Sequence, residues 1–210
     1  MSGRRRRGGR LVALEGIDGT GKSTLARALA TALRARGFRV ALRREPSDQK
    51  LGRLAQAASV ADPWTGAIYF TLDRFLARPA LERALGRHDV VVTDRSFYST
   101  LAYQGTALPR GERLRLERLQ RRVTPPPDEV LLLDLPPREA LARLGRRSTG
   151  RGPLERRRTL ERVAAGYRSM ARRHRWTVLD ARLSRAELVD RALQALGAPP
   201  GPAGRRSGRR

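Results

Sequence analysis

A glycine-rich loop at residues 16–24, GIDGTGKST, constrains the fold of this chain more than any other feature. It follows the apolar run 10–16, which is typical of a buried β-strand, and it leads into a helical pattern at 22–36. The motif G-x-x-x-x-G-K-[ST] is matched by Gly16, Gly21, Lys22 and Ser23. A match to this motif that lies between a strand and a helix predicts a loop that wraps around the phosphates of a nucleoside triphosphate.

The residue types in this loop explain the chemistry that it can perform. Glycine lets backbone N–H groups turn inward around phosphate oxygens, and the N-terminus of the following helix adds partial positive charge. Lys22 can reach the β- and γ-phosphates, and the Ser23 hydroxyl can bind Mg²⁺. We therefore expect ATP, with Mg²⁺ as cofactor, to bind at Gly16, Ile17, Asp18, Gly19, Thr20, Gly21, Lys22, Ser23 and Thr24.

Short apolar runs alternate with longer helical patterns along the chain. Five runs are expected to be strands, at residues 10–16, 38–44, 89–94, 129–135 and 175–181. Several are continuously apolar, as strands buried on both faces are. Helices are expected at 22–36, about 66–86, 97–104, 111–122, 136–145, 154–173 and 184–196. This alternation predicts an α/β fold of the P-loop type, a three-layer α/β/α sandwich with a five-stranded parallel sheet.

Length and composition favour a single folded domain. A chain of 210 residues with 40% hydrophobic residues can bury one sizeable core, and a second independent core is not expected. Residues 1–9 and 198–210 are rich in arginine, glycine and proline and have little to bury, so we expect a disordered basic arm and a disordered tail. The folded domain is then expected at residues 10–197.

The net charge of +25 raises the hypothesis of nucleic-acid binding. However, 43 of the 45 basic residues are arginine, which indicates a codon bias rather than selection for phosphate attraction alone. A surface for single-stranded nucleic acid also needs aromatic side chains for stacking, and aromatic residues make up only 5% of the chain. A basic P-loop module that binds nucleic acid is therefore an alternative that the composition disfavours.

Other features exclude whole classes of site. The chain has no cysteine, which excludes disulfides, thiolate catalysis and cysteine-based metal sites. No run of 18 apolar residues exists, so no transmembrane helix is expected, and no apolar segment of a signal peptide follows the basic N-terminus. These features predict a cytoplasmic protein without a membrane partner.

Four further stretches carry the strongest functional signal. They are RREPSD after the second strand, YFTLDRF in the next helix, TDRSFYSTLAYQG after the third strand, and GRRSTGRGPLE after the helix that follows the fourth strand. Together with EGIDGTGKST and PDEVLLLD, they resemble the thymidylate kinases, which are nucleoside-monophosphate kinases of the P-loop fold. The resemblance covers nearly all of residues 10–197, and DR followed by AYQG is its most specific element.

The resemblance implies a binding site for dTMP as the phosphate acceptor. In it, Arg44 and Arg95 would hold the acceptor phosphate, and Asp18 would accept a hydrogen bond from the sugar 3′-hydroxyl. Phe70 would stack on thymine, and Arg74 would reach a thymine carbonyl. The full set of acceptor residues that it implies is Asp18, Arg44, Phe70, Arg74, Arg95, Ser99, Tyr103 and Gln104.

The resemblance also implies how phosphate transfer would be assisted. Asp94 would lie near Mg²⁺ together with Ser23, and Arg143 would contact the adenine of ATP. A short lid is expected at about residues 145–155, with Arg146, Arg147 and Arg151 in it. Arginines from separate loops suit phosphoryl transfer, because guanidinium groups grip phosphate oxygens in a bidentate manner. The catalytic residues are expected to be Lys22, Arg95, Arg147 and Arg151.

Two departures from the usual family pattern concern the acceptor site. Ser96 stands where tyrosine or histidine is usual, and the triplet 47–49 reads SDQ where GGT is usual. Ser96 also makes this strand end similar to deoxynucleoside kinases, which phosphorylate a nucleoside 5′-hydroxyl and need a carboxylate base, for which Glu45 is the candidate. Arg44 and AYQG favour an acceptor that already carries phosphate. Thymidylate kinases are commonly homodimers, so a homodimer is a further expectation.

Overall fold

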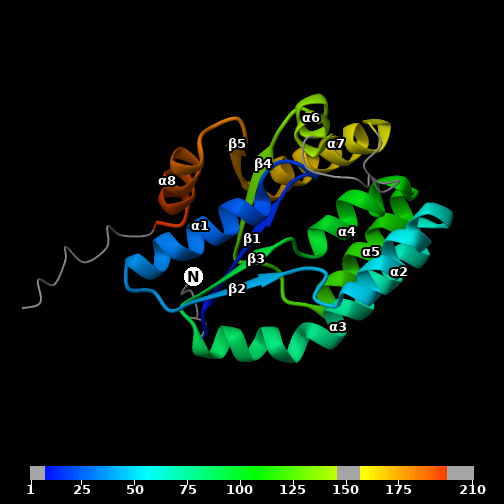
Figure 1. Ribbon diagram of the computed structural model, residues 1–210. Coiled ribbons are helices and arrows are strands. Elements are labelled where there is room, and N and C mark those ends of the chain that lie inside the picture. Colours follow the sequence, from blue (N-terminus) through cyan, green and yellow to red (C-terminus); the bar gives the residue numbers. More distant parts are fainter. Residues whose placement is uncertain (1–7, 146–156, 198–210) are drawn as a thin grey trace, which may run out of the picture.

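The computed structural model describes residues 8–145 and 157–197. Its centre is a five-stranded parallel sheet in the order β2-β3-β1-β4-β5 (Figure 1). The strands are β1 (Arg10–Glu15), β2 (Val40–Arg44), β3 (Val90–Asp94), β4 (Glu129–Asp134) and β5 (Thr177–Asp180). All five expected strands are confirmed, and their ends lie within two residues of the ranges inferred from sequence.

Helices cover both faces of this sheet. They are α1 (Lys22–Ala35), α2 (Gln49–Ala61), α3 (Pro63–Arg87), α4 (Phe97–Tyr103), α5 (Arg110–Val123), α6 (Pro137–Gly145), α7 (Arg157–His174) and α8 (Arg185–Ala195), with a 3₁₀ turn at Gly105–Ala107. Helices α1 and α8 pack together on one face, and α3 lies on the opposite face (Figure 1). The three-layer α/β/α sandwich expected from the alternation of strands and helices is therefore confirmed.

The central strand β1 shows why its sequence is continuously apolar. Val12 and Leu14 pack into the core beneath α1 and α8, whereas Leu11 and Ala13 point to the face covered by α3, α4 and α5. All four are at most 4% exposed. A strand covered on both faces needs apolar side chains at every position, so the usual alternation disappears.

Helix α2 was not expected from the sequence, and α3 begins at Pro63 rather than at about residue 66. The local signals for both starts are present, since Asp48 caps α2 and Asp62 caps α3 immediately before a proline. Residues 49–61 carry a glycine and few large apolar residues, so their helical pattern is weak. Packing against α3 stabilises this helix, and the two form a hairpin beside the sheet (Figure 1).

The parallel register brings three loops to one edge of the sheet. Asp94 at the end of β3 pairs with Leu14 of β1 on one side and with Arg44 of β2 on the other. The glycine loop after β1, the segment after β2 and the turn after β3 therefore leave the sheet next to one another. Ligands of open parallel sheets bind at this edge.

The ends of the domain and the expected lid are described only in part. The tail 198–210, most of the arm 1–9 and the lid segment 146–156 lie outside the described residues. Gly9, which was assigned to the arm, is described, and its N–H donates to the Leu85 carbonyl at 2.7 Å. Within residues 8–145 and 157–197, no helix combines the length and apolarity needed to cross a bilayer.

Candidate active site

The glycine loop joins β1 to α1, as its sequence context predicted. Gly16 and Gly19 have φ angles of 144° and 88°, which disfavour residues with a side chain. A Cβ atom at Gly16 would lie 2.5 Å from the Leu133 carbonyl oxygen, and one at Gly19 would lie 2.5 Å from the Ala140 carbonyl oxygen. Glycine is therefore required at both positions by backbone conformation and by close packing.

Lys22 lies at the start of α1 and is only 6% exposed. Its Nζ donates to the Ile17 carbonyl at 2.8 Å and lies 3.8 Å from Asp18 Oδ1. Burial, together with the nearby charge of Arg95, lowers the pKa of Lys22 to about 8. The ammonium group thus reaches back across the glycine loop to Ile17. When ATP binds, phosphate oxygens can replace the Ile17 carbonyl as its hydrogen-bond partner.

Ser23 and Asp94 meet beside the loop, as a magnesium site requires. The Ser23 hydroxyl donates to Asp94 Oδ2, and the second carboxylate oxygen, Oδ1, is buried without a hydrogen-bond partner among the described residues. In the same part of the chain, no group of three or more His, Asp or Glu side chains could bind a metal by itself. These residues therefore fit a hydrated Mg²⁺ that takes most of its ligands from ATP and water.

A cavity of about 230 Å³ lies next to the loop. Its walls come from the glycine loop, the end of β2, and helices α2, α3 and α4. The lining includes every residue that sequence reasoning assigned to the acceptor: Asp18, Arg44, Phe70, Arg74, Arg95, Ser99, Tyr103 and Gln104. Sequence reasoning did not single out three other lining residues, which are Pro46, Gln56 and Thr100.

Arg95 presents a cation between the glycine loop and this cavity. Its guanidinium pairs with Asp18, donates to Ser99 Oγ at 3.2 Å, and lies 5.4 Å from the centre of the Tyr103 ring. The Tyr103 hydroxyl donates to the other oxygen of Asp18 at 2.9 Å. Burial by itself would raise the pKa of Asp18, but Arg95 and Lys22 hold it below its usual value. Asp18 is therefore the shared anionic partner of both cations.

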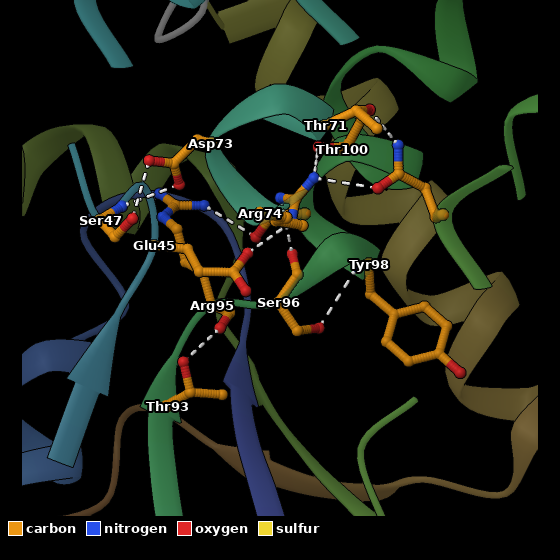
Figure 2. Close-up of polar contacts among 12 residues, drawn as sticks. Glu45, Ser47, Thr71, Asp73, Arg74, Thr93, Arg95, Ser96, Tyr98 and Thr100 are labelled. Atoms are coloured by element: carbon orange, nitrogen blue, oxygen red, sulfur yellow. Dashed lines mark hydrogen bonds and ion pairs between the residues drawn. The ribbon is translucent and has the colours of Figure 1, made fainter. Parts of the chain in front are cut away.

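Arg74 is nearly enclosed in protein contacts, which Figure 2 shows. Its Nε donates to Glu45 Oε2 at 2.6 Å, Nη1 donates to Thr100 and Gln120, and Nη2 donates to the Ser96 carbonyl at 3.2 Å. Four of its five N–H groups thus have acceptors among the described residues. The remaining N–H, on Nη2, is available for a ligand in the cavity that Arg74 lines.

Gln104 also has hydrogen-bonding capacity left over. Its Nε2 donates to Ser59 Oγ at 3.1 Å, whereas Oε1 is buried without a partner among the described residues. A buried carbonyl oxygen without a partner is costly, and Gln104 is one of the residues that line the cavity.

Glu15, which sequence reasoning missed, is the polar centre behind the cavity. It is fully buried and accepts hydrogen bonds from the Ser96 N–H at 2.8 Å, from the hydroxyls of Ser96 and Ser99 at 2.7 Å each, and from the Tyr167 hydroxyl at 2.8 Å. The signal that could have found it is a charged residue at the end of an otherwise apolar strand. A buried carboxylate needs several donors, and these join β1 to α4 and α7.

The remaining expected site residues lie farther from the cavity or outside the described chain. Arg143 of α6 donates through Nη1 to the Ala181 carbonyl at 2.9 Å. Arg146, Arg147 and Arg151 lie outside the described residues.

Comparison with known proteins agrees with this geometry. The family model for thymidylate kinase matches residues 14–192. The chain belongs to the thymidylate kinase family. A probable thymidylate kinase of Metallosphaera sedula is 36% identical over 184 residues, which cover 88% of this chain and 90% of the relative. A thymidylate kinase of Xanthomonas oryzae pv. oryzae is 43% identical over 165 residues, which cover 74% of this chain and 69% of the relative. A probable thymidylate kinase of Sulfurisphaera tokodaii is 34% identical over 188 residues, which cover 89% of this chain and 95% of the relative.

Both departures from the usual thymidylate kinase pattern have partners inside the protein. Ser96 is buried and binds Glu15 through its N–H and its hydroxyl. In the SDQ triplet, Ser47 donates to both oxygens of Asp73 at 2.8–2.9 Å, and Asp48 caps α2. Ser47, Asp48 and Ser96 thus form contacts of their own with the surrounding protein.

Proposed function

We propose that the protein transfers the γ-phosphate of ATP to dTMP, which gives dTDP for dTTP synthesis. The observation that carries this proposal is the cavity beside the glycine loop, which is lined by Arg44 and Arg95 at the same edge of the sheet. Two arginines in the wall of one cavity suit an acceptor that already bears a phosphate. Membership in the thymidylate kinase family supports the same reaction.

The charges around Asp18 suggest how donor and acceptor are aligned. Lys22 and Arg95 both approach Oδ1 of this carboxylate, so the two cations lie close together at the glycine loop. Charge on the transferred phosphoryl group would be stabilised by cations that are already in place, with little reorganisation. When bound through Ser23 and Asp94, Mg²⁺ would neutralise charge on the phosphates of ATP. We propose Arg147 and Arg151 as further catalytic cations and Arg143 as the adenine contact.

The leftover hydrogen-bonding groups favour thymine over cytosine. Gln104 Oε1 can accept the N3–H of thymine, and the unused Nη2–H of Arg74 can donate to its O4. Cytosine presents an acceptor at N3 and an amino group at position 4, so both contacts would be mismatched. Phe70, Ser99 and Tyr103 line the same cavity. Phe70 would stack on the base, Ser99 and Tyr103 would line the base and sugar pocket, and Asp18 would bind the 3′-hydroxyl.

A nucleotide panel tests this function against the deoxynucleoside kinase alternative. With ATP and Mg²⁺, we expect dTMP to be the best acceptor and dUMP to be slower by at most about tenfold, because one buried methyl group contributes roughly 1 kcal/mol. Thymidine should be nearly inert, since it would leave Arg44 and Arg95 without a phosphate. Faster turnover of thymidine than of dTMP would overturn the proposal and would make Glu45, which lines the cavity, the first base to mutate.

We further propose that the protein is a cytoplasmic homodimer that does not use nucleic acid as a partner. The apolar face of α3 that would form the interface, called the α3 face below, consists of Ile68, Leu72, Phe75 and Leu76, which are 42–62% exposed. Their spacing places them on one side of the helix, and a patch of this kind can pack against its own copy about a twofold axis.

A further inference from the structure

The backbone of Arg95 has an unusual conformation. Its φ angle is 77°, and among the described non-glycine residues only Arg175 also has a positive φ. This left-handed region brings Cβ close to the backbone and is disfavoured for every residue except glycine. The surrounding structure must therefore hold Arg95 in place, and the conformation decides where its side chain points.

Four hydrogen bonds hold the backbone of Arg95 and Ser96. The Arg95 N–H donates to the Leu14 carbonyl at 3.0 Å, and the Arg95 carbonyl accepts from the Thr93 hydroxyl at 2.8 Å. The Ser96 N–H donates to Glu15 at 2.8 Å, and the Ser96 carbonyl accepts from Arg74 at 3.2 Å. Figure 2 shows the Thr93 hydroxyl pointing to the Arg95 backbone and Arg74 pointing to Ser96.

Thr93 differs from the other three partners in what it contributes. It is 4% exposed and ends the run Val90, Val91, Val92, so a valine of the same shape would fill its place in the strand. Its hydroxyl makes the contact with the Arg95 carbonyl, and a valine would lack that donor. Leu14 and Glu15 belong to β1, which also leads into the glycine loop, whereas Thr93 lies on β3.

We infer that Thr93 is a positioning residue for the acceptor phosphate. Its hydroxyl stabilises the left-handed backbone of Arg95 and so directs the guanidinium toward Asp18 and the cavity. This inference rests on the proposed role of Arg95 in binding the phosphate of dTMP. Loss of the hydroxyl would leave the partly buried Arg95 carbonyl without this donor, and the turn would relax toward a conformation in which Arg95 is misaligned.

Steady-state kinetics of Thr93→Val test the inference. We expect kcat/KM for dTMP to fall about tenfold, which is the order of effect of one lost buried hydrogen bond, while KM for ATP stays unchanged. Thr93→Ser keeps the hydroxyl and should restore the acceptor parameters. Thr93→Ala should show the same acceptor defect with a lower Tm. Unchanged kinetics of Thr93→Val, or an equal rise in KM for ATP, would overturn the inference.

Thr106→Val is the matched control. This threonine also donates its hydroxyl to a backbone carbonyl, that of Ala102 at 2.6 Å, but it is not among the residues that line the acceptor cavity. The Thr106→Val variant loses the same kind of hydrogen bond as Thr93→Val, so we expect a similar change in Tm but unchanged kinetics for dTMP. An acceptor defect of the same size in Thr106→Val would show that the effect of Thr93→Val is not specific to Arg95.

A double-mutant cycle with Arg95→Ala separates the inference from the proposed function. If Thr93 acts through the Arg95 side chain, Thr93→Val should have no further effect on kcat/KM for dTMP in the Arg95→Ala background. Additive effects would refute the positioning role while leaving the role of Arg95 intact. Wild-type kinetics of Arg95→Ala would refute the proposed phosphate contact itself, and the inference with it.

Discussion

At the scale of single residues, Lys22 is deeply buried and has a pKa close to physiological pH. Its pKa of about 8 in the ligand-free protein lies below the usual value, because burial and Arg95 disfavour the charged form. ATP phosphates favour that charged form. With EDTA present to exclude metal ions, ATP affinity should be constant below pH 8. It should then weaken by up to about tenfold per pH unit above pH 8, as the free protein loses this proton.

Isothermal titration calorimetry between pH 7 and pH 9.5 measures this dependence, and two variants assign it. Lys22→Arg keeps its charge over the whole range, so its affinity should not change with pH. Lys22→Ala should bind ATP weakly at every pH and lose turnover, although Thr20 Oγ1 still donates to the Ile17 carbonyl and preserves the loop. The same pH dependence in Lys22→Arg would show that another group titrates.

At the scale of elements, helix α2 connects the acceptor loop to the cavity wall. Asp48 caps α2 by accepting hydrogen bonds from the N–H groups of Lys50 and Leu51 at 2.7 and 3.0 Å, and its own N–H donates to Asp73 at 2.8 Å. Asp48→Ala removes the cap, so we expect Tm to fall by about 2–4 °C. KM for dTMP should rise several-fold, because α2 begins directly after the short segment that follows Arg44 at the end of β2.

Ser184→Ala is the control for this prediction, since Ser184 forms a capping box with Glu187 at the start of α8, away from the cavity. It should lower Tm by a similar amount and leave KM for dTMP unchanged. Asp48→Asn, which keeps a capping oxygen, should behave nearly as the wild type does. Equal KM changes in the Asp48→Ala and Ser184→Ala variants would indicate a general loss of stability rather than a role for α2.

At the scale of the whole molecule, the α3 face and the net charge of +25 have opposite effects on self-association. Burial of the apolar face favours a dimer, whereas two strongly basic chains repel each other. Light scattering should therefore show a dimer that is stabilised by added salt. Phe75→Asp with Leu76→Asp should give a monomer with an unchanged circular dichroism spectrum.

The exposed residue Val178 on β5 provides the comparison, because it is 52% exposed and lies away from the α3 face. Val178→Asp should leave the dimer intact. A wild-type protein that is monomeric at all salt concentrations, or a dimer that survives both changes on α3, would contradict the proposed interface.

The sequence by itself determined the features that depend on short-range patterns. Continuously apolar runs marked all five strands within two residues of their ends. The spacing of glycines with Lys22 marked the loop, because its conformation requires those residue types locally. The residues assigned to the acceptor through the resemblance do line one cavity, and their individual contacts with dTMP stay predictions.

Only the tertiary structure decided how these residues are held. The contacts of Glu15 with Ser96 and Tyr167 join residues that are 81 and 152 positions apart, and no local pattern reports such pairs. The left-handed backbone of Arg95 depends in the same way on Leu14 and Glu15 of a neighbouring strand. Helix α2 exists because α3 packs against it, although its own sequence favours a helix only weakly. Long-range packing and buried hydrogen bonds select one arrangement among several that the local sequence allows, and the site takes its geometry from that selection.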